Sequence, residues 1–102
     1  MSRFLILYTI NSAIQSADPK IALKETEASL AAVEELQKAG IFKEVGTFNP
    51  GEGFIIAEFP SIEEAFKLAQ SFWPGVITNI REIISWEKTK ESVLSTLKEQ
   101  AK

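Results

Sequence analysis

Hydrophobic and polar positions along the chain repeat with two different periods, and each change of period predicts a new element. Short apolar runs that are rich in β-branched and aromatic residues predict strands. Apolar residues that recur every three or four positions predict amphipathic helices. On these grounds strands are expected at residues 3–10, 41–48, 53–59 and 76–86, and helices at residues 19–39, from 61 to about 72, and at 87–102.

Capping residues support the predicted starts of the first two helices. Asp18 followed by Pro19 is a typical helix start, because the carboxylate accepts an unpaired backbone N–H and proline has no N–H to leave unpaired. Ser61 with Glu64 three residues later has the spacing of a capping box and begins the second helix. An Asn-Pro-Gly-Glu turn joins the two middle strands into a hairpin.

The order of the elements is βαββαβ with a further C-terminal helix. This order predicts a ferredoxin-like α+β fold, in which a four-stranded antiparallel sheet carries both helices on one face. A chain of 102 residues has room for one such core, so we assign residues 1–102 to a single domain.

The strands carry apolar side chains on both faces of the predicted sheet. In the first strand Phe4, Ile6 and Tyr8 lie on one face, and Leu5 and Leu7 lie on the other. A sheet with helices on one face and water on the other should instead alternate apolar and polar residues. Because monomers seldom expose a contiguous apolar surface of more than a few hundred Å², we expect a second, identical subunit to cover the free face. The long last strand, at the edge of the sheet, strengthens this expectation.

Three features together resemble the dimeric α+β barrel superfamily. They are the order of the elements, the strand 53–59 that runs into residues 60–65, and the Trp73-Pro74-Gly75 break before the last strand. The superfamily includes muconolactone isomerase-like, YCII-related, GYD-type and antibiotic-biosynthesis monooxygenase-like proteins and uncharacterised relatives. The resemblance implies two sheets packed face to face in a homodimer, sometimes assembled further, with a small apolar cavity in each subunit. It does not select a reaction.

The composition removes several kinds of chemistry. The chain contains no histidine and no cysteine, which excludes an imidazole base, a Ser-His-Asp triad, a thiol nucleophile, a disulfide and the usual ligands of zinc, haem and iron–sulfur clusters. We therefore expect no metal and no cofactor, and the histidine-dependent members of the superfamily cannot lend their mechanism. Hydrophobic residues make up 45% of the chain and charged residues 25%, which is typical of a soluble globular protein.

Nucleic acids and membranes are not expected partners. The net charge of -3 leaves no basic patch for phosphates, and Glu52 stands where an RNA-recognition strand needs a basic residue before its glycine. The first apolar run, residues 4–10, is far shorter than the roughly 20 residues that span a bilayer. No cleavage site of a signal peptide follows this run. A cytoplasmic location is the expectation.

Polar residues inside the apolar strands are the candidate functional residues, because burying them costs free energy unless they are paired or used. We select Tyr8, Glu58, Asn79 and Arg81 as candidate ligand-binding residues. Arg81 and Asn79 share one face of their strand and would hold an anionic or carbonyl group. Tyr8 or Glu58 would then move a proton. The other interpretation, which we favour over ligand binding, places Arg81 in an interface or rim salt bridge with one of the glutamates.

These observations lead to three alternative functions. The first is a homodimeric protein that binds a small, largely apolar molecule. The second is a cofactor-independent isomerase or monooxygenase that acts on a small aromatic or lactone-like substrate. The third is a structural or regulatory oligomer without a ligand. A cavity between the sheet and the helices would favour the first two functions over the third.

Overall fold

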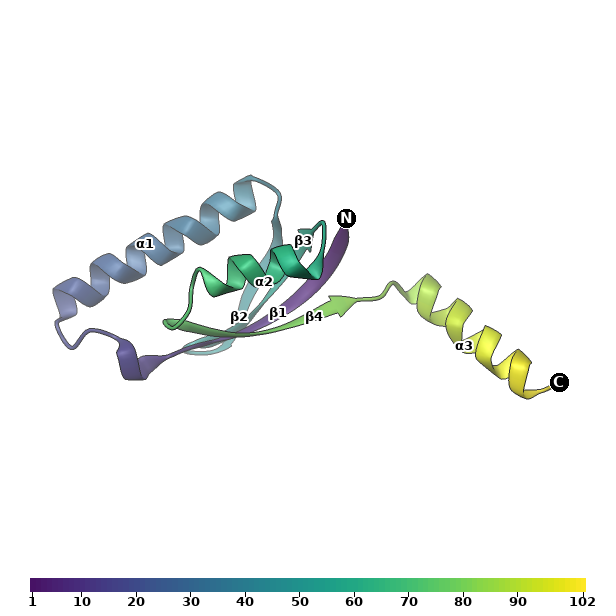
Figure 1. Cartoon of the computed structure of the whole chain (residues 1–102). Helices are drawn as coiled ribbons and strands as arrows, with labels where there is room; N and C mark the ends of the chain where they lie inside the picture. The colour runs from purple at the N-terminus through teal and green to yellow at the C-terminus, as the bar shows by residue number, and fades with distance from the viewer.

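The computed structural model describes residues 1–102, with a four-stranded sheet and three α-helices (Figure 1). The elements in chain order are β1 (Ser2–Ile10), the short 3-10 helix η1 (Ser12–Ile14), α1 (Pro19–Lys38), β2 (Phe42–Asn49), β3 (Glu52–Phe59), α2 (Ile62–Gln70), β4 (Val76–Ile83) and α3 (Trp86–Gln100). The strands form one antiparallel sheet in the order β2-β3-β1-β4. The prediction of an α+β chain with a four-stranded antiparallel sheet is confirmed.

Side-chain caps begin all three α-helices. Asp18 accepts a hydrogen bond from the backbone N–H of Lys20 at 2.9 Å, and Ser61 accepts one from the N–H three residues later at 3.3 Å. These hydrogen bonds confirm both predicted helix starts. The sequence could predict them because a cap joins residues that are close together in the chain. Ser85 caps α3 in the same way, with a distance of 3.2 Å to the N–H three residues later.

The last strand is shorter than the sequence predicts. It ends at Ile83, so the expectation that it reaches Trp86 is wrong. The physical reason is the cap at Ser85, which makes Trp86 the first residue of α3 and leaves Ile84 in the linker. The second helix also ends early, at Gln70, because the following N–H groups bond three residues back and tighten the chain into a turn.

α1 and α2 cover the same face of the sheet, and the core lies between them and the strands (Figure 1). Phe4 of β1 and Phe59 of β3 meet edge to face there, with ring centroids 6.2 Å apart. Only 8 of the 102 residues are buried, although 45% of the chain is hydrophobic, so a single chain leaves much of its apolar surface accessible. The core cluster consists of Phe4, Ile6, Phe42, Ala57, Phe59 and Ala65.

α3 projects from the rest of the chain as an arm (Figure 1). Its apolar residues Val93, Leu94 and Leu97 are half exposed, and Trp86 at its start is 71% exposed. The radius of gyration is 17.7 Å, whereas a compact chain of this length would have about 13 Å. The arm therefore leaves its apolar stripe without a partner in its own chain. Neither α3 nor the other helices combine the length and the hydropathy that crossing a membrane requires.

Candidate functional site

An apolar cavity of about 190 Å³ lies between α1 and the helix-covered face of the sheet. Alternate residues of β1 point into it, because successive side chains of a strand face opposite sides. Leu30 and Val33 contribute the α1 side, and Phe72 contributes from the turn after α2. Ten of the 12 lining residues are hydrophobic, which makes the interior unfavourable for charged groups. The lining residues are Ile6, Tyr8, Ile10, Ser29, Leu30, Val33, Phe42, Val45, Ile55, Phe72, Val76 and Thr78.

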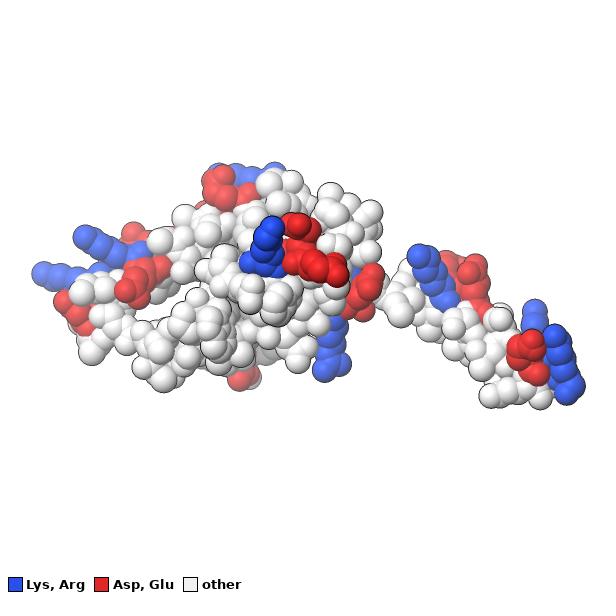
Figure 2. Space-filling model, in the orientation of Figure 1, with Lys and Arg blue, Asp and Glu red and all other residues white.

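A second, larger hollow of about 400 Å³ borders this cavity and shares five of its lining residues. We call it the vestibule. Its wall is more polar, because the loop after β1 contributes Asn11 and Gln15, and α1 contributes Glu25 and Thr26. Charged side chains gather on the outward sides of α1 and α2 and on α3, and the surface between α1 and the sheet is mostly uncharged (Figure 2). The apolar cavity is therefore bordered by the more polar vestibule.

Tyr8 is the candidate residue that lines the cavity. Its hydroxyl donates a hydrogen bond to the backbone carbonyl of Gly46 at 3.3 Å. Its ring lies over Gly53, its partner on β3, where an added Cβ would overlap the phenol ring. The absence of a side chain at Gly53 therefore lets the Tyr8 ring lie flat against the sheet, where Tyr8 forms part of the cavity wall.

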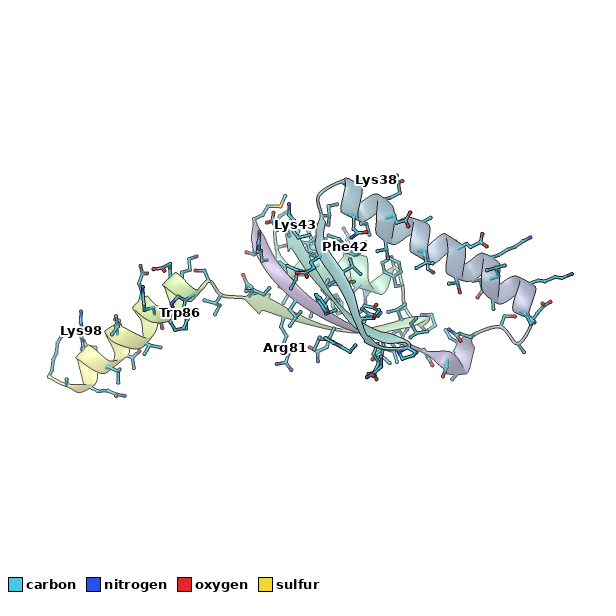
Figure 3. The ribbon with its side chains drawn as sticks, turned by 180° about the vertical axis from the view of Figure 1, so that it is seen from behind. Lys38, Phe42, Lys43, Arg81, Trp86 and Lys98 are labelled. Atoms are coloured by element: carbon cyan, nitrogen blue, oxygen red, sulfur yellow. The ribbon has the colours of Figure 1, made fainter.

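The other three candidates, Glu58, Asn79 and Arg81, lie on the opposite face of the sheet, which we call the outer face. Figure 3 shows Arg81 on the side of the sheet away from α1. The Arg81 Nε–H donates to Asn79 Oδ1 at 3.3 Å. Glu58 forms ion pairs with Arg3 at 3.2 Å and with Lys43 at 3.7 Å. The structure therefore brings Asn79 to Arg81, and does not bring either of them, or Glu58, to Tyr8 within one chain.

The outer face is also rich in apolar side chains. Phe48 stacks on Phe54 with ring centroids 5.5 Å apart, and Gly46 makes room for the Phe54 ring. Phe48 is 62% exposed, and Ile77 on the opposite edge strand is 44% exposed. Side chains of the two central strands complete the patch, which consists of Leu5, Leu7, Phe48, Phe54, Ile56, Ile77 and Ile83.

Two hydroxyl-bearing residues of the cavity wall, Ser29 and Thr78, are not among the residues selected from the sequence. Thr78 lies on the same face of β4 as Val76 and Ile80. A polar residue between two apolar residues of one strand face is the signal that could have identified it. Ser29 precedes Leu30 on the apolar side of α1, and helical spacing alone does not distinguish it from a solvated serine.

Comparison with known proteins gives no relative from which a site could be transferred. No protein-family model, no curated protein and no solved structure matches this chain. No three carboxylates lie close enough together to hold a metal ion. The cavity and the outer face are therefore the features from which a function can be argued.

Proposed function

We propose that this protein is a homodimer that binds a small, largely apolar molecule in the cavity beneath α1. The observation that carries the proposal is the cavity wall, which is hydrophobic except for the hydroxyl groups of Tyr8, Ser29 and Thr78. Small-molecule sites typically combine apolar walls with a few polar groups that orient the ligand.

The size of the cavity limits the ligand. An apolar cavity of about 150 Å³ is large enough for benzene, so a volume of about 190 Å³ has room for one ring with a small substituent. The Tyr8 hydroxyl already donates to Gly46, so its oxygen can still accept a hydrogen bond from the ligand. A single-ring phenol or aromatic alcohol has the right size and carries a hydroxyl group that can donate this hydrogen bond. A longer polar substituent would extend into the vestibule.

The dimer belongs to the same proposal. The strand order β2-β3-β1-β4, with α1 and α2 on one face, supports a ferredoxin-like arrangement. The apolar outer face supports the packing of a second sheet on it, as in a dimeric α+β barrel, because a bare patch of this kind is uncommon on a monomer. A stable interface of standard size buries about 800 Å² per partner, and the arm α3 adds further unpartnered apolar surface.

We prefer binding without catalysis to the isomerase or monooxygenase alternative for a geometric reason. Arg81 and Asn79, which would hold the polar group of a substrate, lie on the face opposite Tyr8. No aspartate or glutamate lines the apolar cavity, so no carboxylate base stands beside Tyr8 there.

Ligand binding is tested by NMR titration with 4-methylphenol. We expect saturable shifts of cavity residues with a dissociation constant of roughly 1 mM, which corresponds to about 4 kcal/mol. Val33→Phe should abolish binding by filling the cavity, and Ala31→Phe, at an exposed position of the same helix, should leave it unchanged. Wild-type shifts that do not saturate, or equal binding by Val33→Phe, would contradict the proposal.

The dimer is tested by sedimentation equilibrium at micromolar concentration. We expect twice the chain mass of 11.3 kDa. Ile56→Lys should give monomers because it buries an unpaired charge on the outer face. Phe66→Lys is the control, since it makes a similar change at an exposed position of α2. A wild-type monomer contradicts the dimer, and a dimer that binds no probe supports the oligomer without a ligand.

A further inference from the structure

Charged residues of opposite sign stand at the two edges of the outer face, in one row of neighbours across the strands. One row crosses all four strands, with Arg81 on β4, Leu5 and Ile56 in the centre, and Glu44 on β2. It therefore has a cation at one edge, two apolar residues in the middle and an anion at the other edge. In the adjacent row of the two central strands, Arg3 on β1 stands beside Glu58 on β3.

The two edge charges of the first row have no ion-pair partner in their own chain. Arg81 and Glu44 are both exposed and take part in none of the five salt bridges of the structure. Arg81 donates through Nε to Asn79, which leaves the remaining guanidinium N–H groups without an acceptor in the chain. An anion placed opposite this edge would satisfy them.

Two identical sheets can face each other in two limiting ways, because the two-fold axis lies between them and parallel to their planes. If the axis runs along the row of Arg81 and Glu44, each strand faces its own copy, and Arg81 faces the partner's Arg81. If the axis runs along the strands, every row faces itself reversed. Arg81 then faces the partner's Glu44, and Leu5 faces the partner's Ile56. Like charges in opposition are unfavourable and opposite charges are favourable, so of these two arrangements the charges favour the reversed one.

We propose that two copies of this chain pack their outer faces with the two-fold axis parallel to the strands, so that β4 of each copy lies across β2 of the other. Arg81 of each copy then pairs with the partner's Glu44. In the adjacent row Arg3, which is paired with Glu58 of its own chain, also faces the partner's Glu58. This inference rests on the dimer of the proposed function and adds its geometry. The partner is a second copy of the chain, because one sheet carries both halves of each charge pair.

Charge reversal tests the pairing. Arg81→Glu and Glu44→Arg should each place like charges opposite each other at two symmetric positions and weaken the dimer by about tenfold or more. The variant with both substitutions exchanges the charges and should return to within about threefold of wild type. Lys67→Glu, on α2, is the control and should leave the dissociation constant unchanged. Dimers of both single variants that are as stable as wild type would overturn the inference.

Thiol crosslinking tests the geometry directly, because the natural chain has no cysteine. Positions 44 and 81 of one chain lie three strand spacings apart, roughly 14 Å, whereas facing positions of two stacked sheets lie about 10 Å apart. This distance is too long for a direct disulfide, which needs Cα atoms closer than about 7 Å, but a bis-methanethiosulfonate with a two-carbon spacer can bridge it. After treatment with this reagent, Glu44→Cys combined with Arg81→Cys should therefore give a covalent dimer joined between these two positions. Each single variant should stay uncrosslinked.

The outcomes separate this inference from the proposed dimer. If Arg81→Cys alone forms a covalent dimer, each β4 faces its own copy, so the axis is wrong and the face-to-face dimer stands. If wild type sediments as a dimer and the combined variant forms no crosslink between positions 44 and 81, the inferred geometry is overturned while the dimer remains. If wild type is a monomer, the dimer and the geometry are both overturned.

Discussion

Ile6 and Leu7 are neighbours on β1 and point to opposite faces of the sheet, which makes them a matched pair for testing what covers each face. Ile6 is 3% exposed and borders the cavity, whereas Leu7 lies on the outer face opposite Phe54. Replacing either by alanine removes three carbon atoms. The two substitutions therefore differ mainly in how well each site is shielded from water.

The magnitudes follow from this burial. Three carbon groups at about 0.8 kcal/mol each give a transfer term of about 2.4 kcal/mol. Ile6→Ala also enlarges a void that is already about 190 Å³, so we expect it to cost about 3 kcal/mol, within the range of about 2–5 kcal/mol for such core changes. Leu7→Ala should cost only about 1 kcal/mol if the outer face is bare, because Leu7 is then partly solvated in the folded state. Coverage by a second sheet raises this to about 2–3 kcal/mol.

Urea unfolding, followed by far-UV circular dichroism at two protein concentrations 100-fold apart, measures both effects. Linear extrapolation gives the free energy of unfolding for each variant. In a dimer the midpoint rises with protein concentration, because association stabilises the folded chain. A Leu7→Ala cost of about 1 kcal/mol together with concentration-independent midpoints would refute the covered outer face. A comparably small cost for Ile6→Ala would refute the packing of the core.

Three further experiments test local features of the fold. Gly53→Ala should lower the free energy of unfolding by about 1–3 kcal/mol, because its Cβ would overlap the Gly46 carbonyl. Gly75→Ala, whose Cβ meets only an ordinary contact at 3.5 Å, should change it by less than about 0.5 kcal/mol, and equal costs would contradict the close packing at Gly53. In the same urea assay Asp18→Ala should cost about 1 kcal/mol and Asp18→Asn much less, since asparagine keeps the capping oxygen; equal losses would mean that the cap contributes little. A synthetic peptide of residues 85–102 should be largely unfolded by circular dichroism, because isolated helices of about 15 residues are marginal in water, and a strongly helical peptide would show that α3 needs no partner.

The elements that were predicted correctly depend on local interactions. The start of α1 follows from Asp18 and Pro19, and the start of α2 follows from Ser61, because a cap joins residues that are neighbours in the chain. The end of β4 was predicted wrongly because Ile84 and Trp86 continue its apolar run. Hydrophobicity alone does not distinguish a strand from the linker and first residue of an exposed helix.

The candidate site was predicted only in part for a related reason. Strand alternation correctly groups Asn79 with Arg81 on one face of β4, since a side chain two positions away always returns to the same face. The sequence did not indicate that Tyr8 would face α1 while Glu58 and Arg81 would face away from it. That depends on the register between β1, β3 and β4, which joins residues more than 40 positions apart.

Composition and short-range periodicity were enough to predict the order of the elements, the helix starts, the two apolar faces of the strands and the exclusion of histidine and cysteine chemistry. The packing of the folded chain was needed to show which face α1 and α2 cover, that a cavity of about 190 Å³ remains beneath α1, and that α3 extends away from the sheet (Figure 1). Cavities and uncovered faces arise where distant segments pack or fail to pack. Their position is therefore set by contacts that no local pattern of hydrophobic residues contains.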